Sequence, residues 1–232
     1  PDFIGMAAGD VPNAAAVLGD LGRFRTWADR LQQGHLNFLY LGRLMRHDAG
    51  FAGDPAFQDA AGAGLLDGSD VFFLGASQGG ILGGAASAVA QDWTRVVLAV
   101  PGMNYSVLLR RSIEFDEFAP LFEAAYPDEL DQQIGLALAQ MLWDRGEDQG
   151  YAQHLTADPY ADTPAKPVLL LEAFGDHQVA NVATENLART IGAGVRSPAR
   201  PDGRATAVEP FWGHQEKAMT PTAKPPTSPR YC

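Results

Sequence analysis

A serine between two glycines is the residue of this sequence best placed to do chemistry. Residues 75–79 (GASQG) match the pattern G-x-S-x-G and follow a short apolar run of β-forming residues at 71–74 (VFFL). A small-residue run with helical character follows at 79–86. Strand, sharp turn and helix in this order form a nucleophile elbow, which presents the serine at its tip. The pattern therefore predicts Ser77 as a nucleophile, and the alternative is an ordinary glycine-rich strand-to-helix turn.

The glycines of the pattern predict close packing around the serine. A Cβ two residues away from Ser77 would collide with the neighbouring strand or helix. The start of the following helix directs backbone N–H groups and a positive dipole end at a developing oxyanion. The backbone N–H of Gln78 is the first predicted donor of this oxyanion hole. A second donor is expected from a loop after an early strand, and the sequence before Ser77 has no such loop.

A serine hydroxyl becomes a good nucleophile when a base takes its proton and a third group orients that base. Where an elbow serves hydrolysis, the acid and then the histidine follow the serine in the chain. Asp176 follows an apolar run at 167–174, so we predict it as the acid; a turn or helix-capping aspartate is the alternative. His214 follows the last predicted strand, and we predict it as the base, with a solvated loop histidine as the alternative. His177 is less suited to pair with Asp176, because adjacent loop side chains diverge.

The elements that must position these residues alternate between strands and helices. Apolar runs predict strands at 71–74, 95–100 and 167–174, with a weak fourth strand at 205–211. Helical patterns predict helices at 14–18 with Asn13 as cap, at 26–47 with Thr26 as cap, after the cap Asp54, and at 183–191. Because a helix separates each strand from the next, we expect parallel pairing and an α/β fold.

The stretch at 103–159 contains no strand pattern. One amphipathic helix is marked by Leu130, Ile134, Leu138, Met141 and Leu142, and another by Phe115, Phe118, Leu121 and Phe122. Such a helical block between two parallel strands predicts either a lid over the site or an ordinary crossover with additional helices. Both interpretations stay open at this point.

Composition limits the classes of partner. The 232 residues suffice for one domain, and 46% hydrophobic with 19% charged residues is ordinary for a globular protein. A net charge of −11 argues against nucleic acid and anionic membrane surfaces, and no apolar run is long enough for a membrane span. The single cysteine, Cys232, excludes an intramolecular disulfide and carries no information on the compartment. The histidines lack metal-ligand spacing, and no phosphate-loop lysine follows the glycines, so no metal or other cofactor is predicted.

These motifs together resemble the later part of a longer bacterial α/β-hydrolase of the serine esterase and lipase superfamily. The matching parts are 75–80 (GASQGG), the G-D-x-x-V element at 175–179, and the terminal pair at 213–214 (GH). More loosely, 30–45, 101–106 and 174–181 are similar to long bacterial members of the superfamily. The resemblance implies a Ser-acid-His hydrolase acting on carboxylic esters, with Ser77 and Asp176 carried over by motif.

We therefore expect a single α/β-hydrolase-like domain over 1–232, with a helical lid at 103–159, an irregular tail at 215–232 and early strands missing. The expected reaction is hydrolysis of a small ester through an acyl-enzyme, with Ser77, Asp176, His214 and the Gln78 N–H as its groups. One alternative is a serine peptidase of the prolyl-oligopeptidase type. The other is a non-catalytic hydrolase fragment that completes its sheet against another chain, which predicts homo-oligomers or aggregation because of an exposed sheet edge.

Overall fold

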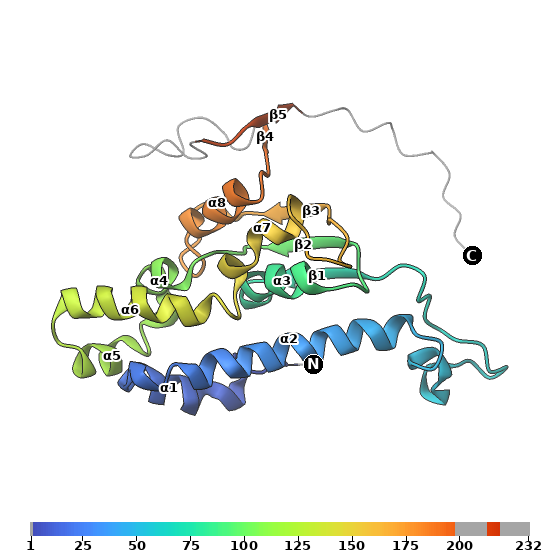
Figure 1. Cartoon of the computed structure of the whole chain (residues 1–232), viewed down its shortest axis with the longest axis horizontal. Coiled ribbons are helices and arrows are strands. Elements are labelled where there is room, and N and C mark those ends of the chain that lie inside the picture. Colours follow the sequence, from blue (N-terminus) through green and yellow to red (C-terminus); the bar gives the residue numbers. More distant parts are fainter. Residues whose placement is uncertain (1, 198–212, 219–232) are drawn as a thin grey trace.

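The computed structural model describes residues 2–197 and 213–218 (Figure 1). Its strands are β1 (Phe72–Ala76), β2 (Arg95–Ala99), β3 (Val168–Leu171), β4 (Val195–Ser197) and β5 (Glu216–Ala218). Its α-helices are α1 (Val11–Gly19), α2 (Arg25–Arg46), α3 (Gln78–Val89), α4 (Tyr105–Leu108), α5 (Ala119–Ala125), α6 (Glu129–Trp143), α7 (Ala152–Thr156) and α8 (Asn181–Thr190). Short 3-10 turns are η1 (Ala8–Asp10), η2 (Leu21–Arg23), η3 (Phe51–Gly53), η4 (Pro55–Phe57), η5 (Leu109–Arg111), η6 (Ile113–Phe115) and η7 (Asp148–Gly150).

The central sheet is parallel and has the order β1-β2-β3. All three strands follow the apolar runs that predicted them, although β3 ends at Leu171, three residues before the predicted end. Helices lie between consecutive strands, as parallel pairing requires. The mixed α/β class is therefore confirmed. Among the described residues before β1 there is only an isolated bridge between Gln58 and Gly64 and no named strand, so the sheet is too small to establish a hydrolase fold.

One face of this sheet is covered by helices. Val96 and Leu98 of β2 pack in a buried cluster with residues of α3, α7 and α8, including Ala86, Leu155 and Leu187. The small residues of α3 permit this closeness, since a Cβ on Gly83 would lie 2.5 Å from the Phe73 ring. The prediction that small side chains bring this helix close to the sheet is confirmed.

The opposite face of the sheet is exposed within the described structure. Leu74 of β1 and Leu169 of β3 flank Val97 in register, and their side chains are 72% and 54% exposed. Phe72 and Leu171 lie on the same face and are also exposed. Parallel sheets are normally covered on both faces, so this apolar surface is unusual.

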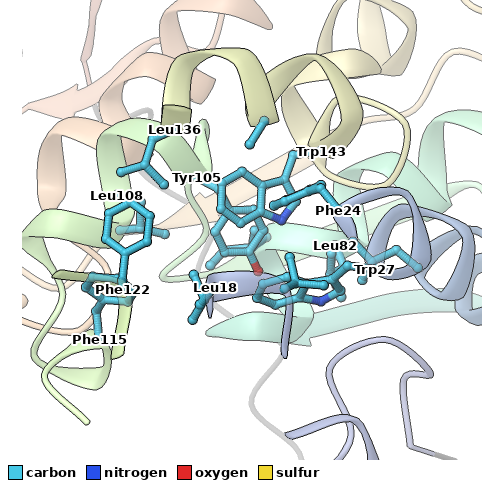
Figure 2. Packing of buried hydrophobic residues seen from close by; sticks show 14 of the residues in the cluster. Leu18, Phe24, Trp27, Leu82, Tyr105, Leu108, Phe115, Phe122, Leu136 and Trp143 are labelled. Atoms are coloured by element: carbon cyan, nitrogen blue, oxygen red, sulfur yellow. The ribbon is translucent and has the colours of Figure 1, made fainter. Parts of the chain in front are cut away.

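A second core lies between the N-terminal helices and the helices of 103–159. Trp143 of α6 is fully buried, and its ring stacks on Tyr105 of α4 at 5.0 Å between centroids (Figure 2). Phe24 and Trp27 meet the same indole edge-on, at 4.5 and 5.7 Å. The helices of 103–159 are thereby fixed against α1 and α2.

The starts of the two N-terminal helices differ from the predicted caps. The first helix begins at Val11, so Asn13 lies inside it, and the second begins at Arg25, so Thr26 lies inside that one. The Thr26 hydroxyl instead lies 3.0 Å from the Asn13 amide oxygen and joins the two helices. The cap predicted at Asp54 is confirmed, but the element that it begins is the short turn η4.

The apolar stripe that predicted α6 faces solvent. Helix α6 covers the predicted residues, but its inward side carries Leu136, Ala139 and Trp143. The exposed side chains of the stripe are Leu130, Ile134, Leu138 and Met141, between 49% and 70% exposed. The aromatic cluster at 115–122 does not form one helix either, because η6 ends at Phe115 and α5 begins at Ala119.

Beyond α8 the chain forms a small separate sheet in which β4 and β5 pair in parallel. Strand β5 lies at 216–218, inside the stretch predicted as an irregular tail, so that prediction is wrong for these residues. The weak strand predicted at 205–211 lies outside the described residues. Figure 1 shows this pair beyond α8, on the side of the molecule away from α1 and α2.

In the ranges that the structure describes, no helix combines the length and the apolar character that crossing a bilayer demands. The same ranges hold no group of three or more His, Cys, Asp or Glu side chains arranged to bind a metal ion.

Candidate active site at the Ser77 turn

Ser77 forms a sharp turn between the last residue of β1 and the first residue of α3. Its backbone has φ 54° and ψ −121°, a left-handed conformation that non-glycine residues rarely hold. Its N–H donates to the Ala99 carbonyl of β2 at 2.9 Å, and its carbonyl accepts from Gly80 N and Ile81 N at 2.8 and 3.0 Å. Hydrogen bonds to the sheet on one side and to the helix on the other thus impose the strained turn.

The glycines around the turn have different roles. A Cβ on Gly75 would lie 2.1 Å from the Gly79 carbonyl oxygen, so no side chain fits at this position. A Cβ on Gly79 would meet nothing within 4 Å, so the steric reason predicted for this second glycine of the motif is wrong. Gly80 is the tight position on the helix side, since its Cβ would lie 2.9 Å from the Ala99 carbonyl oxygen.

Ser77 and Gln78 form part of the wall of a cavity of ≈ 220 Å³. The Ser77 side chain is exposed, and no hydrogen bond of the described structure joins it to Asp176 or His214. Gln78 is the first residue of α3, and a helix leaves its first N–H groups without intrahelical partners. The predicted nucleophile and the predicted donor are therefore both at the cavity.

Asp176 lies in the loop after β3, at the predicted end of the sheet. Its Oδ1 accepts from Gln178 N at 2.8 Å and from Val179 N at 3.0 Å, which closes an Asx turn. Gln178 and Val179 line the cavity. In the described geometry Asp176 stabilises the loop whose residues Gln178 and Val179 line the cavity. This corresponds to the turn aspartate given as the alternative in the sequence analysis.

His214 is not among the described residues that line the cavity. Its Nε2 is 3.4 Å from Nη1 of Arg189, near the end of α8, and it directly precedes the strand pair β4–β5. His177, in contrast, lies immediately before the two cavity-lining residues Gln178 and Val179. Its carbonyl accepts from Ile113 N at 3.0 Å, and its ring is exposed. The loop that carries His177 therefore contributes to the cavity wall, although the sequence analysis gave His177 no role.

Tyr105 is a residue of the site that the sequence did not single out. Its side chain lines the cavity, and its hydroxyl accepts a hydrogen bond from the Gln78 side-chain amide. Burial raises the pKa of Tyr105, so the phenol keeps its proton at neutral pH. The contact fixes the side chain next to Ser77 against α4. In the sequence, Tyr105 is marked only by its place in the 101–106 segment, which is loosely similar to bacterial α/β-hydrolases. That similarity assigns the tyrosine no role.

Two adjacent acids, Glu147 and Asp148, are completely buried behind the turn. Asp148 Oδ1 accepts from Ala85 N of α3 at 2.9 Å, and the lack of a side chain at Gly84 makes room for it. Burial raises the pKa of Asp148 well above its usual range, and the neighbouring Glu147 raises it further. These acids tie the helix behind Ser77 to the helical block of 103–159.

Glu147 bonds in the opposite direction, toward α4 and α6. Its carboxylate accepts from Gln149 N at 3.1 Å, from the Gln140 side-chain amide and from the backbone N–H of Tyr105. Burial raises the pKa of Glu147 to about 7, although these hydrogen bonds act to lower it. No local pattern in the sequence marks a buried acid here, because the burial is created by helices distant in the chain.

The chain matches no family model, no curated protein and no solved structure, so the geometry of this site is the basis for assigning a function.

Proposed function

We propose that this chain is a serine hydrolase that cleaves carboxylic esters through an acyl-enzyme intermediate. The observation that carries the proposal is Ser77 itself. It is a strained serine at a strand-to-helix turn, on the wall of a cavity, with the first N–H of a helix beside it. Strain at a non-glycine residue is retained chiefly at functional sites, and an ordinary connection would place glycine here.

The proposed reaction has two steps. Ser77 Oγ adds to the ester carbonyl carbon while a base takes its proton, and the Gln78 N–H stabilises the oxyanion. The tetrahedral intermediate expels the alcohol, which receives that proton, and leaves the acyl group on Ser77. Water then attacks the acyl-enzyme by the same route, releasing the carboxylic acid and restoring the serine.

The sequence assigns the base to His214 and the orienting acid to Asp176. Both are proposals, and no hydrogen bond joins either residue to Ser77 in the described geometry, so mutation is the test of the histidine. His177 is the competing base, since the residues that follow it line the cavity.

The nucleophile is tested by labelling with a fluorophosphonate probe, which reacts with activated serines. We expect the wild type to label and Ser77→Ala to lose labelling completely. Ser69→Ala, which removes an exposed serine just before β1, serves as the control and retains full labelling. Labelling of Ser77→Ala at the wild-type rate would assign the reaction to another residue and overturn the proposal. Panels of ester and peptide substrates separate an esterase from the peptidase alternative.

The base is tested by comparing His214→Ala with His177→Ala in the same assay. Removing the general base lowers the rate by roughly 10²–10⁴-fold, while removing a bystander leaves it within about twofold. Loss in His214→Ala alone supports the assignment from sequence. Loss in His177→Ala alone transfers the role to the loop at the cavity wall.

The exposed sheet face favours a second candidate, a non-catalytic module that assembles with another polypeptide covering this face. Apolar side chains of β1 and β3 that are 47–72% exposed form a contiguous surface of a kind that marks interaction sites. A protein with this role self-associates or precipitates alone and shows no labelling at Ser77. The fluorophosphonate experiment distinguishes the two candidates, because only the hydrolase labels at Ser77.

A further inference from the structure

The wall of the cavity beside Ser77 combines buried apolar residues with exposed polar ones. Leu18 of α1, Leu108 of α4 and Phe115 of η6 line it and are each less than 10% exposed (Figure 2). Gln178 and Glu114 also line it, the Gln178 side-chain amide donates to the Glu114 carboxylate, and both residues are exposed. Part of the wall therefore belongs to the second core, and part is exposed to solvent.

The charges on the wall indicate a neutral ligand. None of the residues lining the cavity is a lysine or arginine, and Asp10 and Glu114 are its charged groups. Asp10 is already engaged, since its Oδ2 accepts from Gly5 N at 2.7 Å and from Ala7 N at 3.0 Å, and its Oδ1 forms an ion pair with Arg30. A phosphate or carboxylate would meet the Glu114 carboxylate and no cation among the described lining residues, and the nearby Arg30 is already paired with Asp10, so the arrangement disfavours anions.

The size of the cavity limits the length of an apolar chain. An apolar protein cavity of about 150 Å³ accommodates benzene, which has six carbon atoms. By the same proportion the ≈ 220 Å³ beside Ser77 accommodates roughly eight to nine carbons.

We propose that the cavity binds the acyl chain of a neutral medium-chain ester, of about eight carbons, with the ester carbonyl at Ser77. This inference rests on the proposed function and adds the substrate class. The acyl group has to stay bound between the two steps, whereas the alcohol has to leave after the first. The buried apolar part of the wall suits the acyl chain, and the exposure of Ser77 gives the alcohol a route to solvent.

Ala14 and Leu109 are the residues at which chain length can be tested. Both line the cavity, Ala14 from α1 and Leu109 from η5, and both are partly buried. Ala14→Leu fills part of the volume and Leu109→Ala enlarges it. Ala15→Leu is the matched control, because Ala15 lies on the same helix and does not line the cavity.

The kinetic experiment compares kcat/KM for p-nitrophenyl butyrate, octanoate and palmitate. For the wild type we expect octanoate to exceed butyrate roughly ten- to hundredfold, from four additional methylenes leaving water, and palmitate to be poor because its chain exceeds the cavity. Ala14→Leu shifts the preference toward butyrate, Leu109→Ala shifts it toward longer chains, and Ala15→Leu leaves it unchanged. Equal rates for butyrate and octanoate in the wild type, or equal shifts in Ala14→Leu and Ala15→Leu, would overturn the inference.

A binding experiment separates failure of this inference from failure of the proposed function. Ser77→Ala is titrated with 2-nonanone, whose chain matches an octanoyl group, and with 2-pentanone, whose chain matches a butyryl group. We expect 2-nonanone to bind at least tenfold more tightly, and the Ala14→Leu change to abolish that difference. If no ester is hydrolysed and no serine labels while this selectivity persists, the hydrolase proposal fails and the chain-binding cavity stands. If Ser77 labels but the two ketones bind equally, the acyl-chain inference fails alone.

Discussion

At Ser77 the side chain is directed by a backbone that has little freedom to relax. The N–H is held by Ala99 of the next strand, and the carbonyl is held by two N–H groups of the helix that follows. Ser77 therefore cannot rotate out of its left-handed conformation without breaking contacts to both elements. The position of its hydroxyl is set by the sheet and the helix together.

The glycines on either side offer a matched pair of substitutions. Gly75→Ala introduces a Cβ 2.1 Å from the Gly79 carbonyl oxygen, so we expect it to lower the free energy of unfolding by about 2–4 kcal/mol and to abolish labelling of Ser77. Gly79→Ala meets open space inside a helix, so we expect no loss and a gain of up to about 1 kcal/mol. Urea denaturation measures both. Equal destabilisation of the two variants would contradict this account of the turn.

Local pattern predicts the turn well because strand, turn and helix are contiguous in the chain. It does not distinguish Gly79 from Gly80, since the crowding at Gly80 comes from Ala99 and Pro101 of another strand's end. For the same reason it cannot identify Tyr105 or Asp148 as neighbours of the turn. Asp176 follows the third strand, as predicted. Its hydrogen bonds within the turn depend on backbone geometry that residue spacing does not encode.

At the scale of elements, α3 and α4 are linked by the buried acids of the segment between α6 and α7. Asp148 bonds to α3, and Glu147 bonds to the first residue of α4. The two helices carry Gln78 and Tyr105, which contact each other at the cavity. The protonation of Glu147 and Asp148 therefore affects how stably α3 and α4 are held together.

The raised pKa of Glu147 predicts a loss of stability as pH rises. Because its pKa is 4.5 when unperturbed and about 7 when folded, the folded state holds a proton that the unfolded state has released between these values. Stability contributed by this proton is complete below about pH 4.5 and is lost as pH rises through 7, by about 3 kcal/mol in total.

Glu147→Gln removes this titration while retaining a side chain of the same shape. We expect the wild type to lose about 3 kcal/mol more than the variant between pH 5 and pH 8, measured by urea denaturation. His35 and Glu172, whose folded pKa values are about 4 and about 7, titrate in both proteins and cancel in the difference. The pKa of Asp148 is raised in part by Glu147, so the difference reports the titration of these two coupled acids together. Parallel pH profiles for the two proteins would show that Glu147 is not the source.

Helix α6 shows where periodicity predicts an element but not its orientation. The apolar spacing predicted the helix correctly, yet the inward side is formed by Leu136, Ala139 and Trp143. A helix with apolar residues on more than one side gives no single face to the core. Only the packing of Trp143 against Tyr105 and Phe24 determines which side is buried.

At the scale of the whole molecule, the sheet has one covered face and one exposed face. The alternation of strands and helices predicted the parallel sheet. It did not predict which face is exposed, because residues on both faces of a parallel strand are apolar. Leu74 and Leu98 are equally hydrophobic, yet one is 72% exposed and the other is fully buried.

The exposed face predicts self-association that a single charge reduces. Leu74→Lys introduces an ammonium group on the β1 side of this face, at its most exposed apolar side chain, and we expect it to shift the protein toward monomer in size-exclusion chromatography over a concentration series. Because Leu74 is already 72% exposed, the free energy of unfolding changes by no more than about 0.5 kcal/mol. Ile113→Lys, at a side chain 54% exposed outside the sheet, is the control and leaves association unchanged. A wild type that elutes as monomer at every concentration would contradict the expectation.

Trp27 gives the molecule an internal optical reporter. Its indole lines the cavity, donates to the Gly5 carbonyl at 2.7 Å and lies 5.7 Å from the indole of Trp143. A ligand that displaces solvent from the cavity changes the polarity around one of these coupled rings. Intrinsic fluorescence emission therefore follows occupancy directly, with no dye, no turnover and no reactive serine required.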